Sequence, residues 1–182
     1  MSDKKQKILS SKKVFSAELF DVQEEVLQDH NNKKHTFNTV YAKPVASVIP
    51  VTQKGEIYLI KQYRYLFGEY MLGIISGFIE ENETSLQAAK RELKEEAGIE
   101  ASQWEQIAKV TVMRSVVKHY VNIFIAKDLE ISHQHLEDDE DIELVKMSLE
   151  EAVQKVMSGE IYHSSSVTGI LLLNELKRKK QL

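Results

Sequence analysis

The segment between Gly77 and Gly98 constrains the fold more than any other part of the chain, because it carries the marks of one well-delimited helix. Thr84 and Gln87 stand three residues apart, just before a run of periodic apolar residues. That spacing satisfies free N–H groups at the start of a helix. Gly98 suits the left-handed residue just past a helix end. The segment therefore predicts a loop, then a helix of roughly four turns, then a second turn.

The predicted helix has an apolar side and an acidic side. Helical spacing places four residues on the apolar side: Leu86, Ala89, Leu93 and Ala97. Glu92, Glu95 and Glu96 fall on another side, at i, i+3 and i+4. Carboxylates this close repel one another, so a helix gains nothing by collecting them unless a cation lies there. Hard divalent cations prefer carboxylate, water and phosphate oxygens. We therefore expect these three glutamates to bind Mg²⁺ or Mn²⁺.

Arg91 and Glu83 are expected to have a different role. The guanidinium of Arg91 can form two parallel hydrogen bonds with the Glu83 carboxylate. Such a pair would hold the loop against the helix. We interpret Glu83 and Arg91 as structural residues of the segment, together with the glycines at its two ends, Gly77 and Gly98.

The composition bounds the class of protein. The chain has 182 residues, a net charge of −4 and no cysteine. This length fits one domain with a modest extra element. The absence of cysteine excludes disulfides and thiolate metal sites, and the charge argues against a nucleic-acid partner. No apolar run reaches membrane-spanning length, and the N-terminus lacks an apolar signal core. We expect a soluble, cytoplasmic protein without a membrane partner.

Hydrophobic patterning outlines the remaining elements. We expect a frayed terminus at 1–12, a small antiparallel sheet ahead of the main domain, and an acidic loop at 128–141. The helices after the central one are predicted at 149–157 and 164–180, with the serines at 164–166 as cap candidates. One or two strands are predicted at 14–27, and single strands at 35–41, 45–51, 56–65, 71–79, 104–117, 119–126 and 142–147. Strands around one central helix, followed by terminal helices, indicate a mixed α/β layered domain.

The segment from Gly77 to Ile99 resembles the Nudix box, G-x5-E-x7-R-E-U-x-E-E-x-G-U with U aliphatic, at every specified position. The resemblance implies a mixed β-sheet sandwiched between α-helices. It also implies Mg²⁺- or Mn²⁺-dependent hydrolysis of a nucleoside diphosphate linked to another moiety. Carried over by position, the family's metal ligands are Glu92, Glu95, Glu96 and the backbone carbonyl of Ser76.

Most of the chain follows a second pattern: an N-terminal β segment, then Lys43–Pro50, Lys61–Tyr65, the box, and an acidic loop running into a strand and a helix. This order resembles the ADP-ribose pyrophosphatase branch. It implies an N-terminal β segment at 1–43 that exchanges between the subunits of a homodimer, ahead of a catalytic domain at 44–182. Arg64, in the Gln-Tyr-Arg stretch, would contact the nucleotide substrate. The acidic loop would supply a general base, Glu140 by register or Asp138 as the alternative, and Glu95 is a further candidate among the box glutamates.

Two departures from that branch bear on the substrate. A Glu-Leu-Pro-Ala-Gly-like run is replaced by Gly73–Gly77, and a Ser-Pro-Gly-like turn is replaced by Ser115–Val117. ADP-ribose, which would be cleaved to AMP and ribose 5-phosphate, is the leading candidate substrate. Other nucleoside diphosphate sugars, dinucleoside polyphosphates and nucleoside triphosphates stay open. A catalytically silent nucleotide-binding regulator is the alternative from another class.

Overall fold

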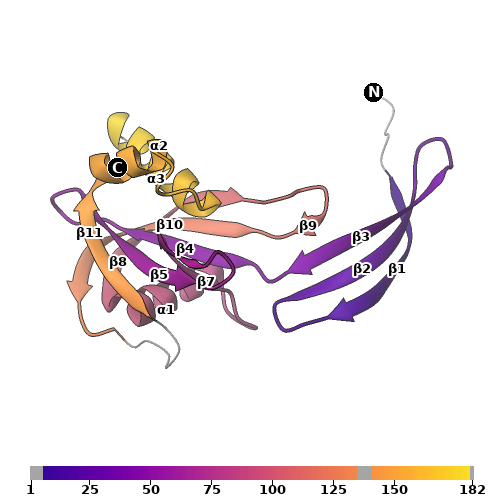
Figure 1. Ribbon diagram of the computed structural model, residues 1–182, viewed down its shortest axis with the longest axis horizontal. Coiled ribbons are helices and arrows are strands. Elements are labelled where there is room, and N and C mark those ends of the chain that lie inside the picture. The colour runs from indigo at the N-terminus through magenta and orange to yellow at the C-terminus, as the bar shows by residue number, and fades with distance from the viewer. Residues whose placement is uncertain (1–5, 135–140, 181–182) are drawn as a thin grey trace. The chain divides into compact units, whose positions relative to one another are not determined.

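The computed structural model describes residues 6–134 and 141–180 of the chain (Figure 1). Within these residues, no helix is both long enough and apolar enough to cross a membrane. The helices are α1 (Ser85–Ala97), α2 (Leu149–Met157) and α3 (Ser164–Arg178). The strands are β1 (Lys7–Ser16), β2 (Phe20–Gln28), β3 (Lys34–Ala42), β4 (Val45–Pro50), β5 (Glu56–Arg64), β6 (Glu69–Gly73), β7 (Ile75–Phe78), β8 (Ile99–Val110), β9 (Val117–Lys118), β10 (Val121–Ile131) and β11 (Ile142–Ser148).

The chain divides into two compact units. The N-terminal unit combines residues 1–44 with the segment Thr111–Tyr120. Its sheet has the order β1-β2-β3-β9, in which only the β3–β9 pair is parallel. None of the hydrophobic side chains buried in the described chain belongs to this unit. Its sheet is therefore held by strand pairing rather than by a core of its own.

The C-terminal unit contains two sheets. One has the order β7-β4-β10-β8, with a parallel β4–β10 pair between antiparallel neighbours. The other has the order β11-β5-β6 and is antiparallel throughout. The parallel pair explains why β4 reads as a continuous apolar run, since a strand covered on both faces has no solvent side.

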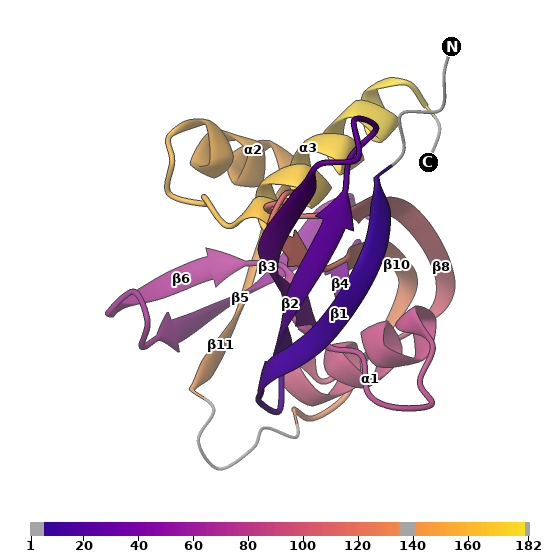
Figure 2. The same ribbon diagram turned by 90° about the vertical axis from the view of Figure 1, so that its right-hand side faces the viewer.

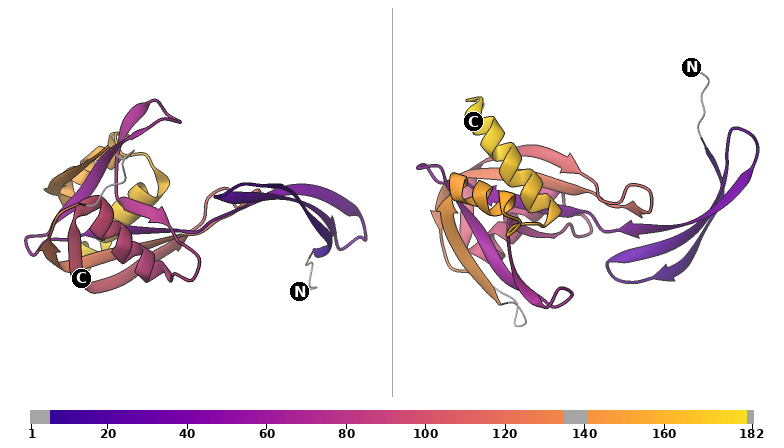
Figure 3. Two further views of the ribbon diagram at one scale, coloured as in Figure 1. Left: turned by 90° about the horizontal axis from the view of Figure 1, so that it is seen from below. Right: turned by 45° about the horizontal axis from the view of Figure 1, so that its top comes forward.

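Helices cover both faces of these sheets (Figure 2). Alternate residues of β4, β5 and β10 enter two separate apolar clusters. One cluster contains Val48, Phe124 and the inner side of α1, which Figure 3 shows in its left view. The other contains Ile49, Ile123 and residues of α2 and α3, which lie in front in the right view. The C-terminal unit is thus a layered arrangement with α1 on one side and the α2–α3 pair on the other.

Several sequence-based boundaries were wrong. Residues 7–12 form part of β1, because they pair with β2 although their lysines and serines do not alternate with apolar residues. The predicted strand 71–79 is two strands in different sheets, broken at Ile74. The loop predicted from 128 begins later, because β10 continues to Ile131 opposite Ile99. The cap residue of α3 is His163 rather than one of the three serines, and its side chain makes no capping hydrogen bond.

Candidate functional site

Helix α1 begins and ends as its sequence predicts. The Oγ of Thr84 accepts a hydrogen bond from the backbone N–H of Gln87, at 3.2 Å, and the Thr84 N–H donates to the Gln87 Oε1, at 2.8 Å. These reciprocal bonds form a capping box. Gly98 ends the helix in the left-handed conformation, with φ of 62°, and its N–H donates to the last carbonyls of α1. The helix is therefore fixed at both ends, independently of any ligand.

Arg91 joins α1 to the turn before it. Its Nε and Nη2 donate to the two oxygens of Glu83, each at 3.1 Å, and Nη2 also donates to the carbonyl of Phe78, at 3.0 Å. The Arg91 hydrogen bonds hold the pKa of Glu83 below its ordinary value, and Glu83 in turn raises the pKa of Arg91. Both groups are therefore charged at neutral pH, and the pair ties the end of β7 to the helix.

The three box glutamates lie in different surroundings. Nη1 of Arg91 donates to Glu92 at 2.6 Å and to Glu95 at 3.1 Å. Glu96 is only 4% exposed, and its carboxylate accepts a hydrogen bond from the N–H of Ser76, at 3.1 Å. Burying a carboxylate is costly unless it is hydrogen-bonded or paired. The β7 backbone thus provides one of the contacts that allow Glu96 to lie inside.

Gly77 allows Glu92 to reach the same backbone. A Cβ built on Gly77 would lie 1.9 Å from Oε1 of Glu92, so no side chain fits at this position. The φ of Gly77 is not in the left-handed region, so the glycine is needed for this close approach and not for a turn. Glu92 and Glu96 therefore converge on two adjacent residues of β7, Ser76 and Gly77.

These residues suit a divalent cation by charge and by donor type. Arg91 contacts three carboxylates, those of Glu83, Glu92 and Glu95, which leaves two excess negative charges before Glu96 is counted. All of the donors are hard oxygens, the class that Mg²⁺ and Mn²⁺ bind. Among residues 6–134 and 141–180, no three His, Asp or Glu side chains are grouped so as to hold an ion. Nη1 of Arg91 donates hydrogen bonds to one carboxylate oxygen of Glu92 and one of Glu95, so these two oxygens face the guanidinium.

Comparison with known proteins identifies the family. The family model described as NUDIX domain matches residues 42–164, about two thirds of the chain. The chain belongs to the Nudix family. The predicted family is therefore confirmed, and so is the prediction that the chain is a Nudix hydrolase.

The chain is similar over nearly its whole length to named relatives and to a solved structure. It is 27% identical over 183 residues to an ADP-ribose pyrophosphatase of Bacillus subtilis (strain 168), covering 100% of this chain and 98% of the relative. It is 25% identical over 170 residues to a methanol dehydrogenase activator of Bacillus methanolicus, covering 92% of each. A crystal structure of an ADP compounds hydrolase superposes with a TM-score of 0.87, at 24% identity and full coverage of both chains. This superposition confirms the predicted α/β fold with its sheet between helices.

Not all of the predicted site residues come together. Glu140 and Asp138 lie outside the described residues. Arg64 ends β5 opposite Glu69 of β6 and is exposed. Burial, and then the charge of Arg64, lower the pKa of His163, which places the guanidinium near the start of α3. Among the contacts of the described residues, none joins Arg64 to the carboxylates of α1.

Sequence reasoning missed Ser166, which explains the altered run ahead of the Nudix box. Its Oγ accepts a hydrogen bond from the N–H of Ile74, at 3.1 Å, and a Cβ on Gly73 would lie 2.8 Å from that oxygen. Ser166 is fully buried. Helix α3 thus holds the break between β6 and β7, and Gly73 is small because Ser166 lies against it. The sequence predicts a helix cap for the serine run at 164–166, and no signal within the sequence links it to Ile74.

A basic cavity in the N-terminal unit was also missed. Its volume is about 310 Å³, and Arg114, Lys118 and His119 line it without any carboxylate among the lining residues. The Nδ1 of His119 is buried without a hydrogen-bond partner, and burial lowers the pKa of this imidazole. Arg114 and Lys118, two cations close together in the segment between two strands, were the sequence signal that could have indicated this cavity. This cavity suits an anion, although nothing in the family box points to it.

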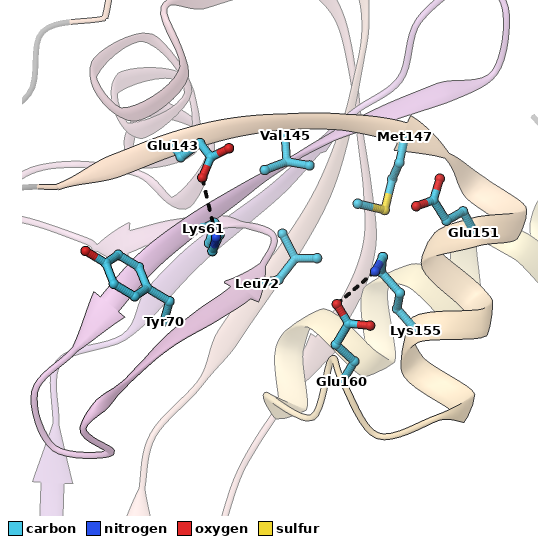
Figure 4. A pocket seen from close by; sticks show the side chains of 9 residues that line it. All are labelled: Lys61, Tyr70, Leu72, Glu143, Val145, Met147, Glu151, Lys155 and Glu160. Carbon is cyan, nitrogen blue, oxygen red and sulfur yellow. Dashed lines mark hydrogen bonds and ion pairs between the residues drawn. The ribbon is translucent and has the colours of Figure 1, made fainter.

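Figure 4 shows a cavity of about 340 Å³ on the α2 side of the β11-β5-β6 sheet. Both of its lysines are paired: Nζ of Lys61 lies 3.6 Å from Glu143, and Nζ of Lys155 lies 2.8 Å from Glu160. Ligand binding here would have to compete with these ion pairs. The cavity shares no residue with the site on α1 and β7.

Proposed function

We propose that this Nudix enzyme hydrolyses the pyrophosphate bond of ADP-ribose, giving AMP and ribose 5-phosphate. The convergence of Glu92 and Glu96 on Ser76 and Gly77 carries the proposal, because it gathers oxygen donors where a pyrophosphate and its counter-ion can be held. Three relatives support the substrate: the ADP-ribose pyrophosphatase of Bacillus subtilis, the ADP compounds hydrolase NudE of Escherichia coli (strain K12) and the ADP-sugar pyrophosphatase of Mus musculus.

The proposed ligands of the ion are the carboxylates of Glu92, Glu95 and Glu96 and the carbonyl of Ser76. Mg²⁺ is the proposed ion, with Mn²⁺ as the alternative, because both take hard oxygen donors. When bound, such an ion neutralises phosphate charge and lowers the pKa of a water ligand.

Side chains of this protein are proposed to assist the attack of water on the pyrophosphate. The oxygen of one water forms a bond to one phosphorus, and the bond from that phosphorus to the bridging oxygen breaks. Glu140 is the proposed acceptor of the proton from that water, with Asp138 or Glu95 as the alternative. Arg64 is proposed to contact a phosphate. Arg91 is proposed to take no part in the reaction. Its N–H groups donate hydrogen bonds to Glu83, Glu92 and Glu95 and so position the turn and these carboxylates.

We also propose that the N-terminal β segment at 1–43 joins two copies of the chain into a homodimer, ahead of the catalytic domain at 44–182. Several large apolar side chains of this segment are exposed: Ile8, Leu9, Val14, Phe15, Leu19, Phe20 and Phe37. A second copy would remove them from water. We also propose a cytoplasmic location, since the proposed substrate, ADP-ribose, is a nucleotide.

Replacement of Glu96 by Gln tests the proposed site. The amide oxygen of Gln can still accept the hydrogen bond from Ser76, so the fold should persist while the charge is lost. We expect kcat for ADP-ribose to fall at least about 100-fold, with an unchanged circular dichroism spectrum. Glu100→Gln is the control, because Glu100 is exposed at the start of β8 and pairs with Lys94. Near-full activity of Glu96→Gln would contradict the metal assignment.

A second candidate function follows from the relative named methanol dehydrogenase activator. Such a chain would act through a partner enzyme rather than through its product. A panel of ADP-ribose, other nucleoside diphosphate sugars, dinucleoside polyphosphates and nucleoside triphosphates separates the possibilities. Turnover of one substrate class identifies the hydrolase and its substrate. Binding without turnover of any member would favour a nucleotide-binding regulator.

A further inference from the structure

A second cavity on the α2–α3 side of the C-terminal unit has a different character from the one in Figure 4. Its volume is about 260 Å³. The segment from Val51 to Gly55, which connects β4 to β5, lines it together with residues near the far end of β10, the start of α2 and the end of α3. No residue of α1 or β7 lines it. The cavity is therefore separate from the carboxylate site.

The floor of this cavity is apolar. Leu149 and Leu173 are 4% and 2% exposed, and both belong to the apolar cluster beneath α2 and α3. Val51 packs against the same cluster. Because the two leucines are already buried, a ligand would remove apolar surface from water mainly at half-buried Val51 and along the methylene stems of Lys127 and Lys177. A wholly hydrated inorganic ion would not use this floor.

The rim carries two lysines, Lys127 and Lys177, that have no carboxylate within ion-pair distance among the described residues. Other lysines of the same unit do pair: Lys146 lies 2.6 Å from Glu56, and Lys155 lies 2.8 Å from Glu160. The ammonium of Lys177 lies over Gly55, where an added Cβ would be 2.8 Å from Nζ. The lysine therefore stands across the β4–β5 turn at the cavity mouth.

The other polar groups of the lining leave this positive charge in place. Asp128 is the one carboxylate among the lining residues, so the two lysines give a net charge of +1. Oδ2 of Asp128 already accepts a hydrogen bond from Nε2 of Gln103, at 2.5 Å. Oγ1 of Thr52 accepts from the N–H of Glu56, at 3.1 Å, which leaves its own proton to donate.

We propose that this cavity binds a small organic anion, a carboxylate or phosphate carried on a small apolar body. The anionic head would lie between Lys127 and Lys177 and accept a hydrogen bond from Thr52. The apolar body would lie against Val51 and the lysine stems, above the buried Leu149 and Leu173. Small-molecule sites of this kind combine an apolar lining with a few polar groups that fix orientation. The proposal does not depend on the activity proposed above, because it uses none of the carboxylate site.

The test is titration of the full-length protein with phenyl phosphate, benzoate, inorganic phosphate and phenol, followed by amide NMR shifts. We expect phenyl phosphate or benzoate to bind with a dissociation constant of about 1 mM or lower. Shifts should centre on Thr52, Gly55 and Lys127. Inorganic phosphate has no apolar body and phenol has no anionic head, so each should bind at least about tenfold more weakly. The tighter of the two aromatic anions identifies the head group.

Single variants decide whether the probe occupies this cavity. Lys127→Gln and Lys177→Gln should each weaken binding about tenfold, and Lys177→Arg should restore most of it. Lys90→Gln, on α1, removes the same charge elsewhere and should leave the affinity unchanged. Absence of binding, binding that survives both glutamine variants, or shifts confined to other residues would overturn the proposal.

Discussion

In the C-terminal unit, β4, β5 and β10 send alternate residues into two apolar clusters, whereas the N-terminal sheet contributes none of the hydrophobic side chains buried in the described chain. Its buried residue is a carboxylate, Glu25, which accepts a hydrogen bond from the hydroxyl of Tyr41, at 2.8 Å. The two units therefore differ in what holds them together. One is stabilised by burial, and the other chiefly by strand pairing and polar contacts.

This difference bears on the proposal that the N-terminal segment joins two copies of the chain. A sheet of few strands is marginal in water unless one face is covered. The carboxylate site lies in the unit that has its own core, on a helix capped at both ends. Catalysis would then tolerate changes in the N-terminal sheet better than assembly would. Three changes of decreasing expected effect test this contrast.

Leu93→Ala should show the largest effect. Leu93 is fully buried in α1, and truncation of such a side chain typically costs about 2–5 kcal/mol of unfolding free energy. Leu9 of β1 is 40% exposed, and Leu9→Ala should cost less than about 1 kcal/mol. Urea denaturation at two protein concentrations measures both. An equal, concentration-independent loss for the two variants would contradict the contrast between the units.

The double variant Phe15→Ser with Phe20→Ser should act on assembly. The two rings lie 5.8 Å apart and are both exposed, so they belong to the surface that a second copy would cover. We expect the dissociation constant of the homodimer to rise about 100-fold. Sedimentation velocity measures it, and Leu171→Ser in α3 is the control. An unchanged association state would exclude this surface as the dimer contact.

Asp29→Asn should have the smallest effect and should depend on pH. A hydrogen bond from His35, and then one from the backbone of Lys33, lower the pKa of Asp29 from 3.8 to about 2. A lowered acid pKa means that the stabilisation is present above pH 3.8 and is lost as the pH falls towards 2. Hydrogen exchange of β2 and β3 should therefore be faster in Asp29→Asn at pH 6, and the difference from wild type should shrink towards pH 2 and vanish below it. Glu18→Gln, an exposed acid of the same unit, is the control.

Local features of the fold were predictable from sequence. The caps of α1 could be predicted because Thr84 and Gln87, and Gly98 with the last turn, act within a few residues of one another. The acidic face was also predictable, although the burial of Glu96 depends on β7, which the helix period does not specify. The strand at 7–12 was missed because only its pairing with β2 makes it a strand.

Long-range features were not predictable. Ser166 and Ile74 are 92 positions apart, and only the fold shows that one holds the other. The same holds for Lys177 over Gly55, where a helix end meets a distant turn. The predicted base, Glu140 or Asp138, lies outside the described residues and stays a prediction. Residue patterns report local periodicity and capping, whereas such contacts arise when remote elements pack.

The decisive measurement is product analysis of the pure protein with ADP-ribose and Mg²⁺. We expect equimolar AMP and ribose 5-phosphate, with formation abolished by EDTA and strongly reduced in Glu96→Gln. Different products, or the same products at an undiminished rate in Glu96→Gln, would contradict it.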